Sequence, residues 1–358
     1  MKKIIVAIDS FKGCLTSIEA NQAAAAGIGS GDPILIPVSD GGEGWLEAFH
    51  AAMGGEIVEV SVKDPLMRPV VAQYLVLGDT AVIEIAKASG LTLLSSEERN
   101  PIVATSYGTG QLVVDAVRKG CKHIIVGLGG SATSDCGIGM LRAIIDAFAG
   151  APTRSLWDDV RELDDVHFTI ATDVTNPLCG ENGAAHVFGP QKFTKVKGAT
   201  PELIEALDAR AKRFAEASAK HLGRDCQNNP GAGAAGGLGY AFLQYMNAEC
   251  RSGIDLLLDT IHFDDLLQDA DLVITGEGSA DRQTLMGKLP FGILQRAKRQ
   301  NVPVMLIAGR IADEQQLLDA GFASVACINP PGLPIEVAMQ PETAKENIRK
   351  TVERLDQQ

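Results

Sequence analysis

This 358-residue chain lacks the features that mark several specialised classes of protein. Aromatic residues make up only 5% of it, and no run of Lys or Arg accompanies the formal net charge of −13. A surface that binds nucleic acid or an anionic membrane needs a positive stripe that displaces counterions. We therefore predict small-molecule partners, with neither nucleic acid nor membrane among them.

The cysteines and the first residues exclude further classes. The seven cysteines are scattered and never form the spacing C-x-x-C, so they predict neither a disulfide framework nor a zinc cluster. The opening sequence MKKIIVAIDS holds an apolar run that is too short for a signal peptide or a membrane span. We expect a cytoplasmic protein with reduced thiols.

Both ends of the chain alternate between short apolar runs and segments with helical spacing. Residues 4–8 are typical of a strand buried on both faces of a parallel sheet, and Thr16 is placed to cap a helix that ends near residue 27. Because the same rhythm returns after residue 270, we predict one parallel sheet built from both chain ends. Its predicted strands are 4–8, 34–38, 271–275, 302–309 and 323–328. The predicted helices between them cover 43–53 and 313–320, and another follows the strand 271–275 after a turn and ends near residue 300.

The middle of the chain follows a different pattern. Residues 56–86 alternate in polarity between short turns, which predicts antiparallel strands. We predict an α/β protein in which a Rossmann-like parallel-sheet domain, residues 1–56 and 269–358, carries an inserted mixed α/β domain, residues 57–268. The later elements predicted in the insertion are strands at 123–127 and 168–172 and helices at 109–119, 135–148 and 202–222.

Glycine is the residue present in excess. The 38 glycines gather in clusters, of which three follow predicted strands and open predicted helices. A helix N-terminus offers unpaired N–H groups, and glycine lets an anion approach them closely. The clusters together predict phosphate or carboxylate binding, although each one alone also suits a tight turn. They lie at 40–44, 107–110, 127–139, 231–239 and 276–283.

Common phosphate and nucleophile motifs are absent. The chain has no GxxxxGK[ST] sequence, no protein-kinase HRD or DFG in a suitable context, and no GxSxG around Ser131 or Ser134. The GxGxxG formed by Gly231, Gly233 and Gly236 follows CQNNP instead of a strand. These observations argue against a Walker ATPase, a protein kinase, a serine hydrolase and a dinucleotide fingerprint.

Acidic residues stand at the carboxyl ends of several predicted strands, the edge at which open α/β sheets bind ligands. Acids that hold Mg²⁺ and accept a hydroxyl proton are what phosphoryl transfer requires. The alternative for each acid is a helix cap or an Asx turn, above all for Asp40 and Asp135. The acids at strand ends are Asp9, Asp40, Asp173 and Glu277.

Taken together, the segments are familiar. The chain contains, in order, IDSFKG (8–13), SDGGEG (39–44), TSYGTG (105–110), GLGGSATSDCGIGM (127–140), ATDVTNPLCGENGAAHVFGPQK (171–192), GAGAAGGLG (231–239), SGIDLLLD (252–259) and ITGEGSADRQTLMGK (274–288). This series resembles the bacterial ATP-dependent glycerate kinases over nearly the whole chain, and the long ATDVTNPL to FGPQK block is unlike any general nucleotide motif.

The resemblance implies a fold and a reaction. It implies a Rossmann-like domain with an inserted domain and an active site in the cleft between them. It also implies that the γ-phosphoryl group of ATP is transferred to D-glycerate with Mg²⁺, with 2-phosphoglycerate favoured over 3-phosphoglycerate as the product. Such a reaction would serve the catabolism of glycerate, glyoxylate or sugar acids.

Candidate roles follow from the residue types. The candidate catalytic residues are Asp173, Asp281 and Lys12: either aspartate would accept the C2 hydroxyl proton, and the lysine would neutralise phosphate or carboxylate. The candidate Mg²⁺ ligands are Asp9, Asp40 and Glu277. The candidate substrate- and phosphate-binding residues are Ser10, Gly129, Gly130, Ser131, Ser134, Asn176, Gly276, Gly278 and Lys288.

Residues 149–166 depart from the family, because they lack the Gly-rich stretch that usually precedes the ATDVTNPL strand. Because of this departure, a second interpretation stays open, in which the chain is a kinase that acts on another small hydroxy acid. A non-catalytic anion-binding protein is a third interpretation, which the carboxylates disfavour because a pure anion binder gains nothing from acids beside its ligand. The oligomeric state, including a homo-oligomer, stays open.

Overall fold

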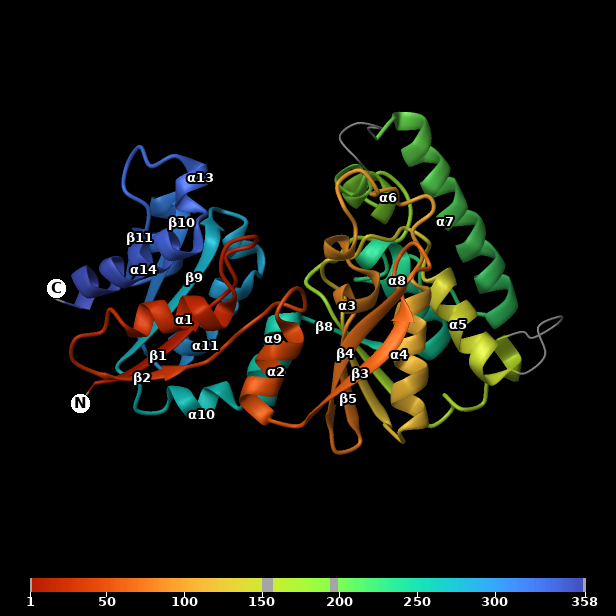
Figure 1. The fold of residues 1–358 in the computed structure, drawn as a ribbon, viewed down its shortest axis with the longest axis horizontal. Helices are drawn as coiled ribbons and strands as arrows, with labels where there is room; N and C mark the ends of the chain where they lie inside the picture. The colour runs from red at the N-terminus through yellow and green to blue at the C-terminus, as the bar shows by residue number, and fades with distance from the viewer. Residues whose placement is uncertain (1, 150–156, 194–198, 357–358) are drawn as a thin grey trace. The chain divides into compact units, whose positions relative to one another are not determined.

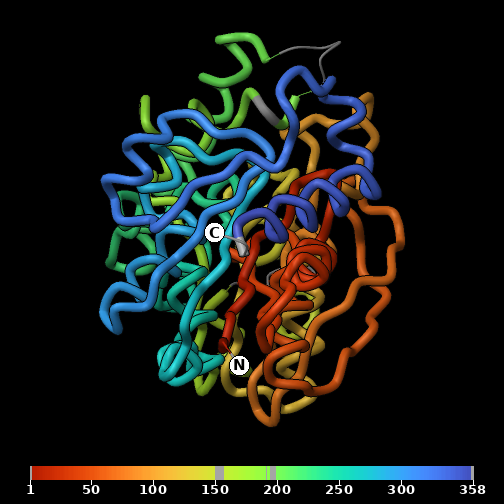
Figure 2. Tube along the Cα trace, turned by 90° about the vertical axis from the view of Figure 1, so that its left-hand side faces the viewer, coloured from red at the N-terminus to blue at the C-terminus, as the bar shows by residue number. Residues whose placement is uncertain are grey.

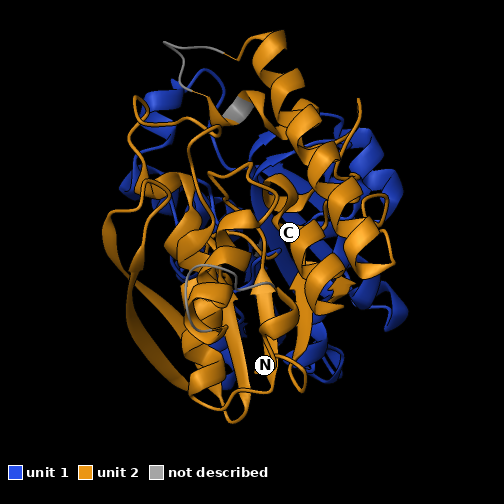
Figure 3. Cartoon of the chain, turned by 90° about the vertical axis from the view of Figure 1, so that its right-hand side faces the viewer, with its two compact units in different colours: residues 1–40, 47–53, 254–358 blue, residues 41–46, 54–253 orange. Residues whose placement is uncertain are grey.

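A computed structural model describes residues 2–149, 157–193 and 199–356, so residues 150–156 of the divergent segment lie outside the described residues. The chain divides into two compact units, which have different colours in Figure 3. Residues 254–268, which we predicted in the inserted domain, pack with unit 1. The division into a Rossmann-like domain and an inserted domain, with the active site in the cleft between them, stays a prediction. Unit 1 comprises Met1–Asp40, Glu47–Met53 and Ile254–Gln358, and unit 2 comprises Gly41–Leu46 and Gly54–Gly253.

Unit 1 is built on a five-stranded sheet in which all neighbouring strands are parallel (Figure 1). The first strand, β1, lies between one strand from the start of the chain and one from its last third. The prediction of one parallel sheet from both chain ends is therefore confirmed, although β2 begins and ends earlier than predicted. The order is β11 (Ser324–Cys327), β10 (Val304–Ile311), β9 (Leu272–Ala280), β1 (Lys3–Ile8) and β2 (Asp32–Leu35).

Helix α1 (Ser17–Ala25) begins directly after the predicted cap. Thr16 Oγ1 accepts a hydrogen bond from Glu19 N at 3.2 Å, and the Glu19 carboxylate accepts one from Thr16 N at 3.0 Å. This capping box satisfies two amides at the start of the helix. The other helices that lie wholly or mostly in unit 1 are α2 (Trp45–Met53), α9 (Gly253–Thr260), α10 (Phe263–Leu267), α11 (Leu289–Arg299), α12 (Glu314–Ala320), α13 (Ile335–Ala338) and α14 (Pro341–Asp356).

Helix α14 was absent from the elements that we predicted. Its apolar residues Ala344, Ile348 and Val352 recur at every fourth position of a charged segment, and all three are buried in the core that covers one face of β1. In Figure 2, α14 (blue) lies beside α1 (red). The two helices approach so closely that a Cβ at Gly27 would lie 2.3 Å from the Arg349 carbonyl oxygen.

Unit 2 holds a six-stranded mixed sheet. Its first three strands form an antiparallel meander, as predicted, and the following strands pair in parallel. The change from antiparallel to parallel occurs at β5, where crossover helices begin to connect the strands. In sheet order the strands are β3 (Glu56–Lys63), β4 (Pro69–Leu77), β5 (Thr80–Glu84), β6 (His123–Gly127), β7 (His167–Ala171) and β8 (Glu249–Arg251).

The helices of unit 2 cover this sheet. In the longest of them, α7 (Pro201–Leu222), Leu207 and Ala211 are buried as predicted, whereas Leu203 and Phe214 are half-buried. Within the described residues, no helix has the length and apolar character that crossing a membrane requires. The helices are α3 (Ala86–Ser89), α4 (Tyr107–Arg118), α5 (Ile138–Phe148), α6 (Ala184–Phe188), α7 (Pro201–Leu222) and α8 (Ala234–Met246).

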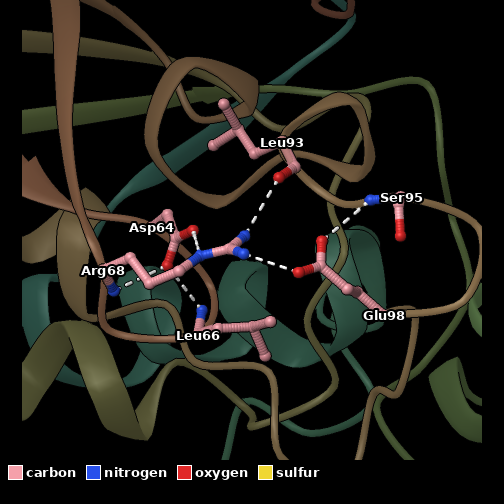
Figure 4. Close-up of polar contacts among 6 residues, drawn as sticks. All are labelled: Asp64, Leu66, Arg68, Leu93, Ser95 and Glu98. Carbon is pink, nitrogen blue, oxygen red and sulfur yellow. Dashed lines mark hydrogen bonds and ion pairs between the residues drawn. The ribbon is translucent and has the colours of Figure 1, made fainter.

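A polar cluster fixes the turn between β3 and β4 to the segment 91–98 (Figure 4). The buried Asp64 carboxylate accepts three hydrogen bonds from the turn, two of them from Arg68. The Arg68 guanidinium also pairs with Glu98 at 2.6 Å. Because Leu91 N donates to the Gly130 carbonyl oxygen at 2.9 Å, the cluster holds this segment against the glycine loop that follows β6.

We predict that Thr16→Ala lowers the free energy of unfolding by about 1 kcal/mol, because the first turn of α1 loses its side-chain acceptor. Urea unfolding monitored by circular dichroism measures the change. Thr16→Ser keeps the hydroxyl and is expected to unfold like the wild type. Equal stability of the Ala variant and the wild type would contradict the role of the capping box.

Candidate active site

A cavity of about 460 Å³ opens in unit 1 at the carboxyl ends of the parallel strands, where open α/β sheets bind ligands. Seven of the residues that we predicted from the sequence line it: Asp9, Ser10, Lys12, Asp40, Glu277, Gly278 and Lys288. Another part of its wall is apolar and consists of Phe11, Cys14, Ile328, Ile335, Ala338, Met339 and Ala344. The cavity thus combines charged and apolar lining residues.

The pKa values of two carboxylates in this cavity are raised, and burial is the main cause. Burial, together with the charge of Asp40, raises the pKa of Asp9 to about 8. Burial also raises the pKa of Glu277. Glu277 Oε1 accepts a hydrogen bond from Thr284 Oγ1 at 2.6 Å, and Glu277 Oε2 lies 3.5 Å from Lys288 Nζ. A cation bound beside Asp9 would favour its ionised form.

The carboxylates suit Mg²⁺ as partial ligands. Within residues 2–149, 157–193 and 199–356, no three His, Cys, Asp or Glu side chains are grouped so that they could hold a metal ion alone. Mg²⁺ does not need such a cage, because it is usually bound through one or two carboxylates plus substrate phosphates and water. Asp9 and Asp40 fit that arrangement, since the charge of Asp40 already acts on Asp9. Glu277 has Thr284 and Lys288 as partners instead.

The glycine cluster 276–283 does not open a helix, so that prediction was wrong. Strand β9 continues through it to Ala280, and Gly276 pairs with Ile8 of β1 and Ile307 of β10. A Cβ at Gly276 would lie 2.4 Å from the Ile307 carbonyl oxygen, so glycine is needed here for close strand packing. The backbone of Gly276 is enclosed between strands, whereas Gly278 reaches the cavity.

Asp281 lies beyond the end of β9. Its Oδ1 accepts a hydrogen bond from Gln283 N at 2.7 Å, and its own N–H donates to Thr284 Oγ1 at 3.1 Å. These bonds form an Asx turn, which is the structural alternative that we considered for the acids. Asp281 is not among the residues that line the cavity.

A smaller cavity, of about 210 Å³, lies in unit 2 beside the glycine loop after β6. Gly129, Gly130 and Ser131 line it, as predicted for an anion site, and Gly130 has a φ of 71°, which favours glycine. Gly129 N donates to the Gly41 carbonyl oxygen, whereas Gly130 N has no acceptor in the described part of the chain. The remaining walls are Leu91, Leu128, Val174, Phe188, Lys192 and Ala235.

Asp135 ties this loop to the starts of α4 and α5. Its carboxylate accepts hydrogen bonds from Ser106 N and Ser106 Oγ at 2.8 and 2.9 Å, and from Gly137 N and Gly139 N at 3.1 Å. The capping alternative for Asp135 is therefore confirmed. The neighbouring Ser134 is buried outside the cavity lining, and its Oγ has no partner in the described residues.

Asp173 and Asn176 follow β7, at the carboxyl end of the unit 2 sheet. Asn176 Nδ2 donates to the Asn182 carbonyl oxygen at 2.9 Å, and the Asn176 carbonyl oxygen accepts from Gly233 N at 2.9 Å. Asn176 therefore fixes the conformation of this loop. Neither Asp173 nor Asn176 lines one of the two cavities, and their roles toward substrate stay predictions.

Sequence reasoning missed two cations that the structure places in cavities. Arg310, at the end of β10, lines the cavity of unit 1. Lys192 lines the cavity of unit 2 and is only 5% exposed. A lysine is exposed by default, and the available signal was the position of Lys192 at the end of the long ATDVTNPL to FGPQK block.

The profile of the glycerate kinase family matches residues 4–358. The chain belongs to the glycerate kinase family. This match confirms the resemblance that the eight sequence segments indicated, and it identifies the chain as a kinase. Every described residue of both cavities falls within the matched range.

Named members of the glycerate kinase family are similar to this chain over nearly their full length. The glycerate kinase of Bacillus subtilis (strain 168) is 42% identical over 98% of this chain and 95% of its own length. The glycerate 2-kinase of Escherichia coli (strain K12) is 41% identical over 91% of each chain. The crystal structure of a Salmonella typhimurium LT2 protein described as glycerate kinase 2 has a TM-score of 0.80 and 39% identity, and the match covers 99% of this chain and 97% of that one. The predicted α/β fold is thereby confirmed.

We predict that Asp135→Asn destabilises the protein by about 2 kcal/mol, because an amide nitrogen cannot accept the hydrogen bonds that one carboxylate oxygen now accepts. Thermal unfolding of the purified variant tests this. Asp164→Asn is the matched control, since the Asp164 side chain is 61% exposed. A melting temperature of Asp135→Asn that equals that of the control would show that the hydrogen-bond cluster contributes little.

Proposed function

We propose that this chain is an ATP-dependent glycerate kinase that phosphorylates the C2 hydroxyl of D-glycerate, giving 2-phosphoglycerate and ADP. The observation that carries the proposal is the similarity to the Escherichia coli glycerate 2-kinase, which extends over 91% of both chains. The cavity of unit 1 supports it, because carboxylates, lysines and an apolar wall meet at the ligand-binding edge of a parallel sheet.

The cavity of unit 1 is the proposed nucleotide site. Its volume of about 460 Å³ is within the usual range for small-molecule sites, and its apolar lining residues suit an adenine ring. Lys12 and Lys288 would bind phosphate oxygens, and Asp9 with Asp40 would hold Mg²⁺. When bound, this ion neutralises charge on the oxygens of the β- and γ-phosphates.

Asp173 is the proposed proton acceptor. In the reaction, the C2 oxygen of glycerate bonds to the γ-phosphorus, and the bond between that phosphorus and the β–γ bridging oxygen breaks. The hydroxyl proton passes to the carboxylate, and ADP leaves. Asp281 is the other candidate, and its Oδ1 accepts a hydrogen bond from Gln283 N. A cytoplasmic location, and Mg²⁺ as the metal, are part of the same proposal.

The direct test is to incubate the purified protein with ATP, Mg²⁺ and D-glycerate and to record the ³¹P NMR spectrum of the product. We expect 2-phosphoglycerate together with ADP. A reaction without D-glycerate controls for ATP hydrolysis. No phosphoglycerate above background would refute the activity, and 3-phosphoglycerate as the product would refute the proposed position of transfer.

We predict that Asp173→Asn lowers kcat by a factor of about 10² to 10⁴, the usual contribution of a positioned general base. The amide keeps the size of the side chain, so the circular dichroism spectrum and melting temperature should stay close to those of the wild type. Asp281→Asn serves as the comparison and should lower kcat much less. Near-normal turnover of Asp173→Asn would remove this residue from the proposed mechanism.

A further inference from the structure

Lys192 is a buried cation with little compensation from the protein. Its side chain is 5% exposed, and its Nζ donates a hydrogen bond to the Thr133 carbonyl oxygen. No carboxylate forms an ion pair with it in the described residues. Asp135 is the acid whose charge acts on it, but that carboxylate already accepts hydrogen bonds from Ser106 and from backbone amides of α5 and the residue before it.

Such an arrangement is unfavourable in an empty cavity. A buried charge costs free energy unless an opposite charge and hydrogen bonds satisfy it. Accordingly, burial lowers the pKa of Lys192 to about 8. An ammonium has three donors, and the Thr133 carbonyl oxygen uses one of them. The group is therefore placed to accept an anionic ligand in the space beside it.

The cavity around Lys192 is shaped for a small ligand with one anionic group. It holds about 210 Å³, and Leu91, Leu128, Val174 and Phe188 supply apolar walls. The glycine loop also lines the cavity, and Gly130 N has no acceptor in the described part of the chain. One buried cation and one available backbone donor match the two oxygens of a single carboxylate.

We propose that this cavity is the acceptor site and that Lys192 binds the carboxylate of the hydroxy acid. The inference rests on the proposed kinase function and assigns it a second ligand site, in unit 2. A nucleoside triphosphate suits this cavity less well, because it carries several negative charges, whereas Lys192 supplies a single positive charge. The cavity of unit 1 is larger and is lined by Lys12, Lys288 and Arg310.

Steady-state kinetics of Lys192→Met test the assignment. Met has a similar length and no charge, so we expect KM for D-glycerate to rise by roughly 10- to 100-fold, the usual effect of losing a charged hydrogen bond. KM for ATP should change by less than about twofold. An unchanged KM for D-glycerate would overturn the proposal, and so would a rise in KM for ATP alone, which would indicate a phosphate subsite. Lys220→Met, at an exposed position of α7, is the matched control.

A binding experiment separates recognition from a structural role. Calorimetric titration with D-glycerate, and the shift in melting temperature that D-glycerate causes, should show binding to the wild type and to Lys220→Met but not to Lys192→Met. Without ligand, Lys192→Met should melt at the same or a higher temperature, because a poorly compensated buried charge has been removed. A variant that melts at a lower temperature but keeps the wild-type response to D-glycerate would overturn the proposal. It would show that Lys192 has a structural role, through its hydrogen bond to the Thr133 carbonyl oxygen.

Lys192→Gln covers the case in which the Met variant does not fold. Its amide can still donate to the Thr133 carbonyl oxygen but has no charge, so we expect the same loss of D-glycerate binding. Wild-type affinity in this variant would overturn the proposal. The titration also separates the proposed Lys192 site from the proposed kinase activity. Wild-type protein that binds D-glycerate through Lys192 but forms no product would refute the kinase activity and leave the anion site supported.

Discussion

The pairing of β1 with β9 is the interaction on which the candidate nucleotide site depends. These strands come from opposite ends of the chain, and Thr275 Oγ1 reaches the Ala7 carbonyl oxygen across a separation of 268 positions. The pairing continues past the last residue of β1, because Asp9 N donates to the Gly276 carbonyl oxygen at 2.9 Å. Asp9 and Glu277 are therefore brought into one cavity by backbone hydrogen bonds, and their positions are fixed before any ligand binds.

Each cavity holds a buried ionisable group under the same physical constraint. In unit 1, burial and the nearby Asp40 raise the pKa of Asp9, whereas in unit 2 burial lowers the pKa of Lys192. In a low-dielectric environment, a poorly compensated charge is stabilised most strongly by a partner of opposite sign. Asp9 therefore favours a bound cation and Lys192 a bound anion, although the chain as a whole carries a net charge of −13.

Much of the fold could be predicted from local patterns. The apolar runs predicted all five strands of the parallel sheet, the alternation over 56–86 predicted the antiparallel meander, and Thr16 predicted the start of α1. The error at residues 276–283 has its cause in contact between distant parts of the chain. Gly276 resembles a turn residue because nothing nearby in the sequence reveals that Ile307 packs against it.

The candidate site was predictable to a smaller extent, for the same reason. Acids at strand ends follow from the topology of a parallel sheet, so Asp9, Asp40 and Glu277 could be placed in one cavity. The capping role of Asp135 depends on Ser106, which lies 29 positions earlier. The burial of Lys192 arises only when the segment after α6 folds against the glycine loop. The family resemblance supplied the function, which charges and spacings alone did not specify.

The position of α14 has a consequence for the synthesis of the protein. Ile348 and Val352 belong to the same buried core as Ile4 and Val6 of β1, so this core is complete only after residues 341–356 have been synthesised. At translation rates of roughly 5 to 20 residues per second, that delay is on the order of tens of seconds. A product that terminates a few turns early would keep this surface exposed and would be a ready substrate for chaperones and proteases.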